Sequence, residues 1–286
     1  VIKTDGYGHG AVPIAEMFET VPYVWGYAVA CTGEAEILRA RGIRKPILVL
    51  GCVFPDEYET MVKNDIRAAV YTEEMARGMS EAAVKLNKTA YFHIKIDTGM
   101  GRIGFPVCDE SADTVKRIST LPNVCLEAMF THFAKADETD KSYTLMQHEK
   151  FMQMKEKIEE RKIPIRYFDC DNSAGIIDFP DMKHDLARAG IAMYGMYPSD
   201  EVNKEAVDLR PALRLVSHVT FVKDVEPGTS ISYGGTFTAE KKNAGCHDPG
   251  RLWRWISAFP LQQRGGADPW KACKDPGQSL HGSVHG

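Results

Sequence analysis

The chain has 286 residues, which is long enough for one large α/β domain and part of a second. Hydrophobic residues make up 44% of it and charged residues 26%, as in globular proteins without membrane-spanning segments. The formal net charge is −4, and lysines and arginines are interleaved with acids along the chain, which excludes a nucleic-acid-binding protein of the basic-patch type.

The seven cysteines are scattered, and none of them forms a C-x-x-C pair. This pattern excludes a disulfide framework and a zinc site, and it favours reduced thiols in a cytoplasmic protein. The first motif begins at Val1, and we expect no signal peptide in this protein. Because Val1 already lies inside that motif, we expect the true start of the protein to lie upstream.

The first ten residues combine two β-branched residues, a lysine at position 3, and then a glycine at every second position from Gly6. This order predicts the end of a strand at Lys3 and a loop whose backbone approaches a ligand closely. A lysine there suits a Schiff base with a phosphate-bearing cofactor. Taken alone, Lys3 is better explained as a solvated surface lysine, so the hypothesis depends on the segments that follow.

Short apolar segments alternate with amphipathic segments from residue 1 to about residue 191. Strands are predicted at 1–2, 24–28, 46–50, 68–71, 90–96, 125–130, 167–168 and around Arg188. Helices are predicted near 11–20, 32–42, 55–64, 73–87, 108–120 and 142–161. Eight strand-and-helix units predict an α/β fold of the (β/α)8 TIM barrel type rather than a doubly wound sheet. Gly99-Met100-Gly101 is followed by Arg102 and continues as loop, which disfavours a Rossmann nucleotide site.

Several chemically versatile side chains follow the predicted strands at their C-terminal ends, where TIM barrels place their active sites. These are Lys3 after the first strand, His132 after the sixth, Asn172 and Ser173 after the seventh, and Arg188 to Ile191 at the last. Ser173 and the backbone N–H groups of Gly190 and Ile191 are the predicted donors of a phosphate site.

The chain becomes polar after residue 200. Leu213 to Val222 then alternates apolar and polar residues, as a half-buried strand does, and Pro227-Gly228 predicts a turn. We therefore predict a barrel domain at 1–200 and the beginning of a β-rich C-terminal domain at 209–243. Residues 244–286 show no strand alternation and are predicted to be a disordered tail.

The segment Lys3 to Gly10, KTDGYGHG, resembles the cofactor-lysine motif of the alanine racemases. Further segments match that family in the same order, namely Lys95 to Arg102, Thr131 to Phe133, Asn172 to Gly175, Arg188 to Gly195 and Ile231 to Gly234. The resemblance covers roughly residues 1–243 and implies a TIM barrel that binds pyridoxal 5'-phosphate (PLP). It also implies a cytoplasmic homodimer that interconverts L- and D-alanine and supplies D-alanine for bacterial peptidoglycan.

By this resemblance, Lys3 forms the Schiff base with PLP and is one of two catalytic bases, while Tyr233 is the second base, supplied by the partner subunit. Arg188 faces the pyridine nitrogen and leaves it unprotonated, because a guanidinium does not give up its proton. Lys95 stands where many relatives have a carbamylated lysine, an anionic partner for Arg102. The other implied contacts are Tyr7, Ser173, Gly190 and Ile191 at the phosphate, Arg102 at the phenolic oxygen and the substrate, His132 beside the ring, and Asn172 at the cofactor.

Structural roles remain open for three of these residues when each is taken alone. They are a salt bridge for Arg188, a strand aromatic for Tyr233 and a hydrogen-bonded barrel-mouth histidine for His132. Relatives commonly have a histidine where this chain has Asp169, whose carboxylate is expected to pair with Arg188. This difference leaves open a serine or broad-specificity racemase of the same fold. The other rival is a non-catalytic PLP-binding barrel protein, which would lack a second domain.

The tail after residue 243 departs from the family pattern. Codons for Gly245 to Trp255 can be chosen so that the same bases, read one base later, encode VATIPVGYGDG, which family members carry at this place. Codons for Pro276 to His285 can likewise encode LGRVCMDQF, a later family segment. Codons 241–243 can be written as a run of A, where one extra base would shift the frame. We therefore expect 244–286 to be an out-of-frame translation and the chain as written to be inactive.

Overall fold

The computed structural model describes residues 1–286 except 215–220, 232, 236, 241, 248–255 and 258–286. The chain divides into two compact units, Val1–Leu213 and Arg214–Gly286, which are treated separately below. Of the helices in the described residues, none has the length and hydropathy of a membrane span.

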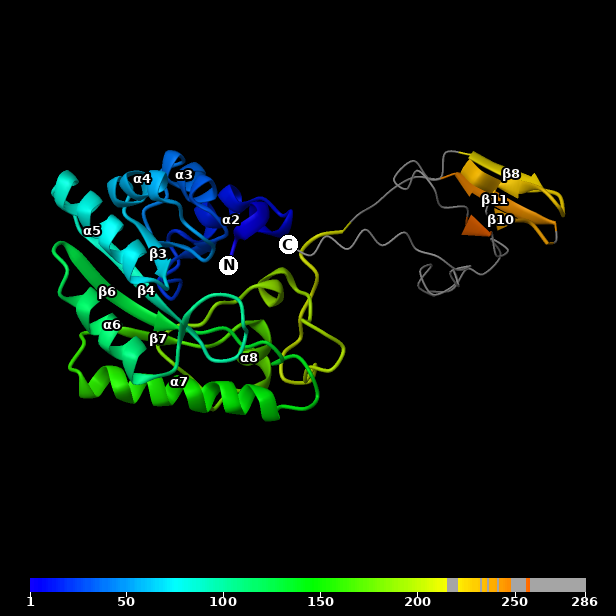
Figure 1. The fold of residues 1–286 in the computed structure, drawn as a ribbon. Coiled ribbons are helices and arrows are strands. Elements are labelled where there is room, and N and C mark those ends of the chain that lie inside the picture. The colour runs from blue at the N-terminus through cyan, green and yellow to red at the C-terminus, as the bar shows by residue number, and fades with distance from the viewer. Residues whose placement is uncertain (215–220, 232, 236, 241, 248–255, 258–286) are drawn as a thin grey trace. The chain divides into compact units, whose positions relative to one another are not determined.

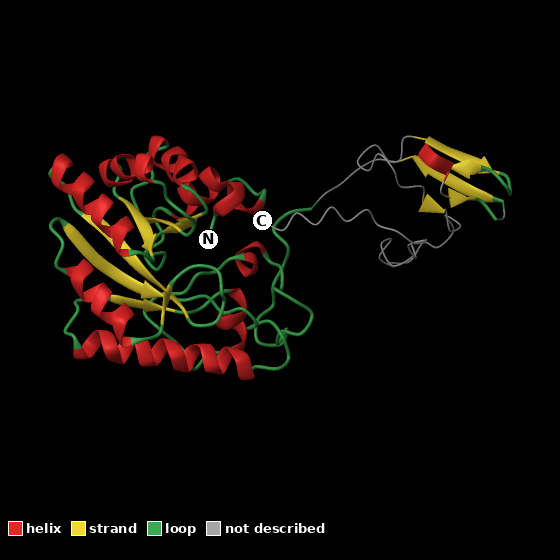
Figure 2. Ribbon diagram, viewed as in Figure 1, coloured by secondary structure: helices red, strands yellow, loops and turns green. Residues whose placement is uncertain are grey.

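A curled parallel sheet forms the centre of the first unit (Figures 1 and 2). Its strands are, in spatial order, β1 (Tyr27–Val29), β2 (Ile47–Val49), β3 (Ile66–Val70), β4 (Ala90–Asp97), β6 (Val124–Phe130) and β7 (Tyr167–Asp169). Every neighbouring pair is parallel, and the short β5 (Phe105–Pro106) joins β4. In β1 and β2 all residues are buried, as expected of parallel strands that are covered on both faces.

The sheet closes into a TIM-barrel-like ring through the first two residues of the chain. The backbone nitrogen of Ile2 donates to the carbonyl of Ala28 in β1 at 2.9 Å. On the other side, the backbone nitrogen of Val1 donates to the carbonyl of Ala189 at 2.7 Å. Segments 188 residues apart in the sequence therefore meet at this seam of the barrel.

The two segments at the seam are not regular strands, which corrects the prediction of eight strands. Each makes individual backbone hydrogen bonds instead of a ladder; for example, Arg188 N donates to Asp171 O at 2.9 Å. Ladder formation stops because a helical turn follows each segment directly, at Lys3 on one side and at Ile191 on the other. The predicted positions of the six strands between these two segments are confirmed.

Helices lie on the outside of the curled sheet (Figure 2). They are α2 (Ala11–Phe18), α3 (Thr32–Ala40), α4 (Tyr58–Lys63) after the short η1 (Pro55–Glu57), α5 (Glu73–Leu86), α6 (Asp109–Ser119) and α7 (Ser142–Glu160). All six predicted helices are confirmed. The sequence explains α5 well, since Met75, Met79 and Ala83 recur every fourth residue and are buried, and Thr72 caps the N-terminus by accepting from Met75 N.

Among the short helical segments that were not predicted, α8 and η2 lie at the site described below. Helix α8 (Ser173–Asp178) begins after Asn172, whose Oδ1 accepts from the backbone N–H of Gly175 at 2.9 Å. The 3-10 turn η2 (Ile191–Tyr194) follows Gly190. An asparagine before a short apolar run is an N-cap signal that was available in the sequence.

The second unit contains two small antiparallel sheets. One consists of β8 (Phe221–Val225), β11 (Asn243–His247) and β12 (Ile256–Ser257), and the other of β9 (Ser230–Ile231) and β10 (Phe237–Thr238). The strand predicted at 213–222 and the tail predicted at 244–286 lie mostly outside the described residues. The expected loss of strand structure at residue 244 is not seen at that point, because β11 continues to His247.

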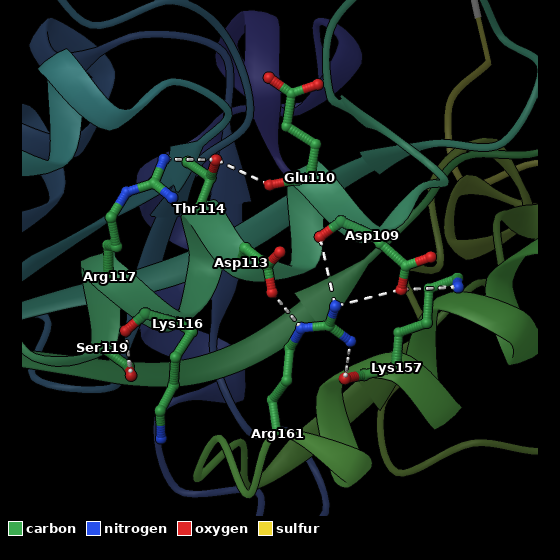
Figure 3. A network of polar contacts seen from close by, with 9 residues as sticks. All are labelled: Asp109, Glu110, Asp113, Thr114, Lys116, Arg117, Ser119, Lys157 and Arg161. Carbon is green, nitrogen blue, oxygen red and sulfur yellow. Dashed lines mark hydrogen bonds and ion pairs between the residues drawn. The ribbon is translucent and has the colours of Figure 1, made fainter.

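Helices α6 and α7 are joined by a polar network on their exposed sides and by apolar contacts beneath it. In Figure 3, the side chains of Arg161 and Lys157 point toward α6. Arg161 Nε donates to Asp113 Oδ1 at 2.6 Å, and Lys157 Nζ donates to Asp109 Oδ1 at 3.0 Å. Met154 of α7 is fully buried and belongs to the main hydrophobic core.

We expect the buried apolar contacts, and not the exposed ion pairs, to stabilise this pair of helices. Met154→Ala should lower the free energy of unfolding by about 2–5 kcal/mol, because it leaves a cavity in the core. Arg161→Ala should leave the urea midpoint almost unchanged, because exposed ion pairs are screened by water. Urea denaturation followed by circular dichroism measures both. A larger loss for Arg161→Ala than for Met154→Ala would contradict the expectation.

Candidate active site

Lys3 lies at the start of a short helical segment, α1 (Lys3–Tyr7), and not at the end of a strand as predicted. The backbone inside this segment is left-handed, with φ of 54° at Thr4 and 54° at Tyr7. The Lys3 ammonium lies 5.9 Å from the centre of the Tyr7 ring. The glycine-rich turn thus brings the lysine and the tyrosine of the first motif together.

Tyr7, Ser173 and Gly190 come from three separate segments and meet in one cradle. Ser173 Oγ accepts from the backbone N–H of Gly190 at 2.9 Å and from that of Ala192 at 3.2 Å. A Cβ added at Gly190 would lie 3.2 Å from the Tyr7 hydroxyl and 3.5 Å from the Ser173 hydroxyl. Glycine therefore leaves room between two hydroxyls and backbone N–H groups, which is the donor set that an anion such as phosphate requires.

The guanidinium of Arg188 is buried, with 8% of the residue exposed, and held on several sides. Its Nη1 contacts the carboxylate of Asp169 at the end of β7, which confirms the expected pair. Its Nη2 donates to the carbonyls of Thr131 at 2.7 Å and Cys170 at 3.3 Å. The ring of Phe130 lies beneath it, 5.1 Å from the central carbon. Three of the five N–H donors are used in this way, which leaves two for a ligand.

Two buried carboxyl groups adjoin Arg188. Burial raises the pKa of Asp169 to about 6, although the charge of Arg188 opposes the rise. Burial, and then the charge of Asp169, raise the pKa of Asp171 to about 6 as well. In each group Oδ1 has no hydrogen-bond partner among the described residues. The hydrogen-bonding capacity of both carboxyl groups is therefore only partly used, and both change protonation state just below neutral pH.

Four cations from separate predicted segments surround His132. Burial first, and then the charges of Arg188, Lys95, Arg102 and Lys3 in that order, together lower the pKa of His132 to about 3. The imidazole is therefore neutral at physiological pH, and among the described residues its ring has no hydrogen-bond partner. This does not support the interpretation of His132 as a hydrogen-bonded structural histidine.

Lys95 is the most deeply buried of these cations, with 2% of the residue exposed. Its Nζ donates to the neighbouring carbonyl of Ile96 at 2.8 Å. Burial, followed by the charge of Arg188, lowers its pKa from 10.5 to about 7. Arg102 is exposed at the rim of the same region. An amine in this state is partly neutral near pH 7 and therefore nucleophilic.

Asn172 and Tyr233 were also predicted to be site residues. The side chain of Asn172 caps α8 and donates from Nδ2 to the carbonyl of Phe133 at 3.3 Å, so it has a structural role whether or not it contacts a cofactor. Tyr233 begins the 3-10 turn η3 (Tyr233–Gly235) of the second unit, not a strand. Its role as a second base remains a prediction.

Three residues at the site were not singled out from the sequence. Phe130 lies under both buried cations, with the Lys95 Nζ 5.4 Å from its ring centre. The ring of Tyr194 lies 4.9 Å from that of Tyr7. Glu34 accepts from the backbone nitrogen of Thr4 in the lysine loop and from that of Ala30 directly after β1. Phe130 adjoins one motif segment and Tyr194 lies within another, so both were accessible on that basis, whereas Glu34 lies in an unrelated helix without such a signal.

Comparisons with known proteins agree with this geometry. A family model described as alanine racemase, N-terminal domain, matches residues 1–198. The alanine racemase of Clostridium tetani is 46% identical over 243 residues, which are 85% of this chain and 62% of that protein. That of Methanococcus maripaludis is 44% identical over 243 residues, or 85% and 65%. A solved alanine racemase of Clostridium difficile 630 has a TM-score of 0.79 at 42% identity, covering 87% of this chain and 64% of that one. The chain thus spans less than two thirds of the length of these relatives.

The ring of parallel strands with a cationic mouth at the strand ends defines a TIM-barrel-like α/β protein. The match of the family model to most of the chain, together with relatives well above 30% identity, shows to which family of such proteins the chain belongs. The chain belongs to the alanine racemase family.

The raised pKa of Asp169 predicts a pH dependence of stability. Its pKa is about 6 in the fold against about 3.9 in an unfolded chain, so the folded state binds the proton more tightly. The resulting stabilisation is complete below about pH 4 and is lost as the pH rises through 6, by on the order of 3 kcal/mol. Asp169→Asn should flatten this fall between pH 4.5 and 7.5, as measured by urea midpoints of the barrel.

The matched control is Asp113→Asn, which changes an exposed aspartate of α6. It should keep the pH dependence of the parent chain. The same dependence in Asp169→Asn would show that the carboxyl of Asp169 titrates elsewhere.

Proposed function

We propose that the chain is part of a cytoplasmic alanine racemase, which uses PLP to interconvert L- and D-alanine and supplies D-alanine for peptidoglycan. Membership of the family supports this function. The observation that carries it is the convergence of Lys3, the hydroxyls of Tyr7 and Ser173, and the buried Arg188 at one end of the barrel.

The residues of the barrel mouth fit PLP. Lys3 attaches the cofactor, and the phosphate is held by the hydroxyls of Tyr7 and Ser173 and the N–H groups of Gly190 and Ile191. The space that a Cβ at Gly190 would fill supports this assignment. Bound PLP supplies an electron sink that makes the α-proton of the amino acid acidic. His132, whose imidazole is neutral, would pack beside the ring, and Arg102 at the rim would bind the cofactor oxygen and the substrate carboxylate.

With the cofactor bound, Arg188 would offer one of its remaining N–H groups to the pyridine nitrogen. A guanidinium cannot deliver a proton there at physiological pH, so the nitrogen stays an acceptor of a hydrogen bond. The ion pair with Asp169 supports this role, because it holds Arg188 charged in its buried position. The ion pair also satisfies the structural interpretation of Arg188, so the function rests on the whole set of residues and not on this pair.

Racemisation needs proton removal on one face of the substrate and proton delivery on the opposite face. Lys3 serves one face from within the barrel. We assign the other face to Tyr233 of a second copy of the chain, and hence propose a homodimer. Tyr233 belongs to the second unit and not to the one that contains Lys3, so the two proposed bases lie in separate units of the chain.

Lys95 is the proposed site of a carbamate. The neutral amine adds to carbon dioxide through a new N–C bond and releases one proton, which leaves an anionic carbamate. Relative to the protonated lysine, two protons are released and a cation is replaced by an anion. The pKa of about 7 supports this step, since a substantial fraction of the amine is then unprotonated at neutral pH. The product places a negative charge near Arg188 and Arg102, where an unmodified Lys95 adds a further buried positive charge.

We infer further that residues after 243 are translated out of frame. The relative from Clostridium tetani aligns over 243 residues, and the shifted frame restores two family segments, which supports this inference. The expected cause is one extra A within codons 241–243. The nucleotide sequence across codons 240–247 reports it directly.

The decisive test compares the chain as written with the same gene after removal of one A, both expressed from the natural start codon. The frame-restored protein should form D-alanine from L-alanine and sediment as a dimer, and the chain as written should do neither. Lys3→Ala in the restored protein should abolish turnover, because the cofactor attachment and one base are lost together. Lys150→Ala, which removes an exposed lysine of α7, is the control and should retain it.

Other outcomes of this test separate the alternatives. Equal turnover of serine identifies a broad-specificity or serine racemase of the same fold. PLP binding without turnover in the restored protein identifies a non-catalytic PLP-binding barrel. Comparable turnover by the chain as written contradicts both the frame shift and the two-subunit site.

A further inference from the structure

The turn that carries Lys3 has a backbone conformation that side chains oppose. Thr4 has φ 54° and ψ 50°, Asp5 has φ 51° and ψ 48°, and Gly6 continues in the same region. Only Gly6 adopts this left-handed region without steric conflict between its Cβ position and the backbone. Threonine is especially disfavoured there, because it is branched at Cβ. The turn therefore needs contacts from outside the segment to remain in this conformation.

Glu34 of α3 provides such contacts with both carboxylate oxygens. Its Oε1 accepts from the backbone N–H of Thr4 at 2.7 Å, and its Oε2 accepts from the backbone N–H of Ala30 at 2.8 Å. Ala30 directly follows β1, whose Ala28 carbonyl accepts from Ile2. One side chain thus connects the start of the left-handed turn to the end of a barrel strand.

A second carboxylate holds the turn only from within. Asp5 Oδ1 accepts from the backbone N–H of Ala11 at 2.8 Å, which joins the turn to the start of α2. This bond closes the loop on itself but does not relate it to the barrel. Among the described residues, Glu34 is the side chain that ties Thr4, the neighbour of Lys3, to the sheet.

We propose that Glu34 is a positioning residue, which holds Thr4 in its left-handed conformation and thereby aims Lys3 and Tyr7 at the cofactor. This inference rests on the proposed function of Lys3. Without Glu34, the N–H of Thr4 loses its acceptor and the steric preference of threonine returns the backbone to negative φ. Because Lys3 precedes Thr4 directly, its side chain then leaves the barrel mouth.

The test is Glu34→Gln, which keeps the size of the side chain but replaces one of its two acceptor oxygens by an NH2 group. One of the two backbone N–H groups then faces a donor instead of an acceptor. PLP affinity should fall by about tenfold or more, as expected for the loss of a charge-assisted hydrogen bond. Hydrogen–deuterium exchange of the segment 1–10 without cofactor should become faster, while the urea midpoint changes little. Glu36→Gln on the exposed side of α3 is the control, since Glu36 has no polar partner among the described residues.

Rescue separates positioning from a merely structural role. Glycine accepts positive φ freely, so Thr4→Gly added to Glu34→Gln should restore most of the PLP affinity. A role confined to the N-terminus of α3 would not be rescued by a change in the loop. Each variant is measured in the chain as written and in the frame-restored protein.

Two results overturn the proposal, namely unchanged PLP affinity and exchange in Glu34→Gln, or affinity that Thr4→Gly fails to restore. If the unsubstituted proteins do not bind PLP, the proposed function fails. The exchange of residues 1–10 then still decides whether Glu34 holds the turn.

Discussion

The arrangement of the site depends on a buried guanidinium that must be neutralised. Burying an unpaired charge costs far more than burying an apolar side chain, and Arg188 avoids this cost through Asp169 and the carbonyls of Thr131 and Cys170. These partners follow or end β6 and β7. The bonds that compensate the charge therefore also hold two neighbouring strand ends in register, and removing one partner affects the shape of the barrel mouth as well as its charge.

Positive charge exceeds negative charge at this mouth. The pKa values of Lys95 and His132 are both lowered, by burial first and then by neighbouring cations. Nearby acids offset this only in part, because burial raises the pKa of Asp169 and Asp171. A site of this kind favours anionic ligands, since each added negative charge relieves repulsion that the fold already contains. Phosphate, a substrate carboxylate and a carbamate all meet that requirement.

Much of the barrel could be predicted from local pattern alone. Buried parallel strands are short apolar runs, and their covering helices repeat every three or four residues, so β3 and α5 were found close to their observed bounds. The pairing of Asp169 with Arg188 followed from the family resemblance, because Asp169 stands where relatives commonly have a histidine beside this arginine. The course of the backbone at Lys3 could not be predicted, because the β-branched Val1-Ile2 favours a strand. The left-handed turn that follows is contacted at Thr4 by Glu34, a residue 30 positions away in the chain.

The seam between Val1 and Ala189 has a consequence for the order in which the domain folds. The residues that meet there are separated by almost the whole barrel sequence, and contacts of such high sequence separation form late because a long loop must first be closed. Lys3 and the cradle at Gly190 lie on opposite sides of this seam. On a ribosome, the central strands can begin to pair while synthesis continues, but the proposed cofactor site forms only after the final barrel segment has emerged.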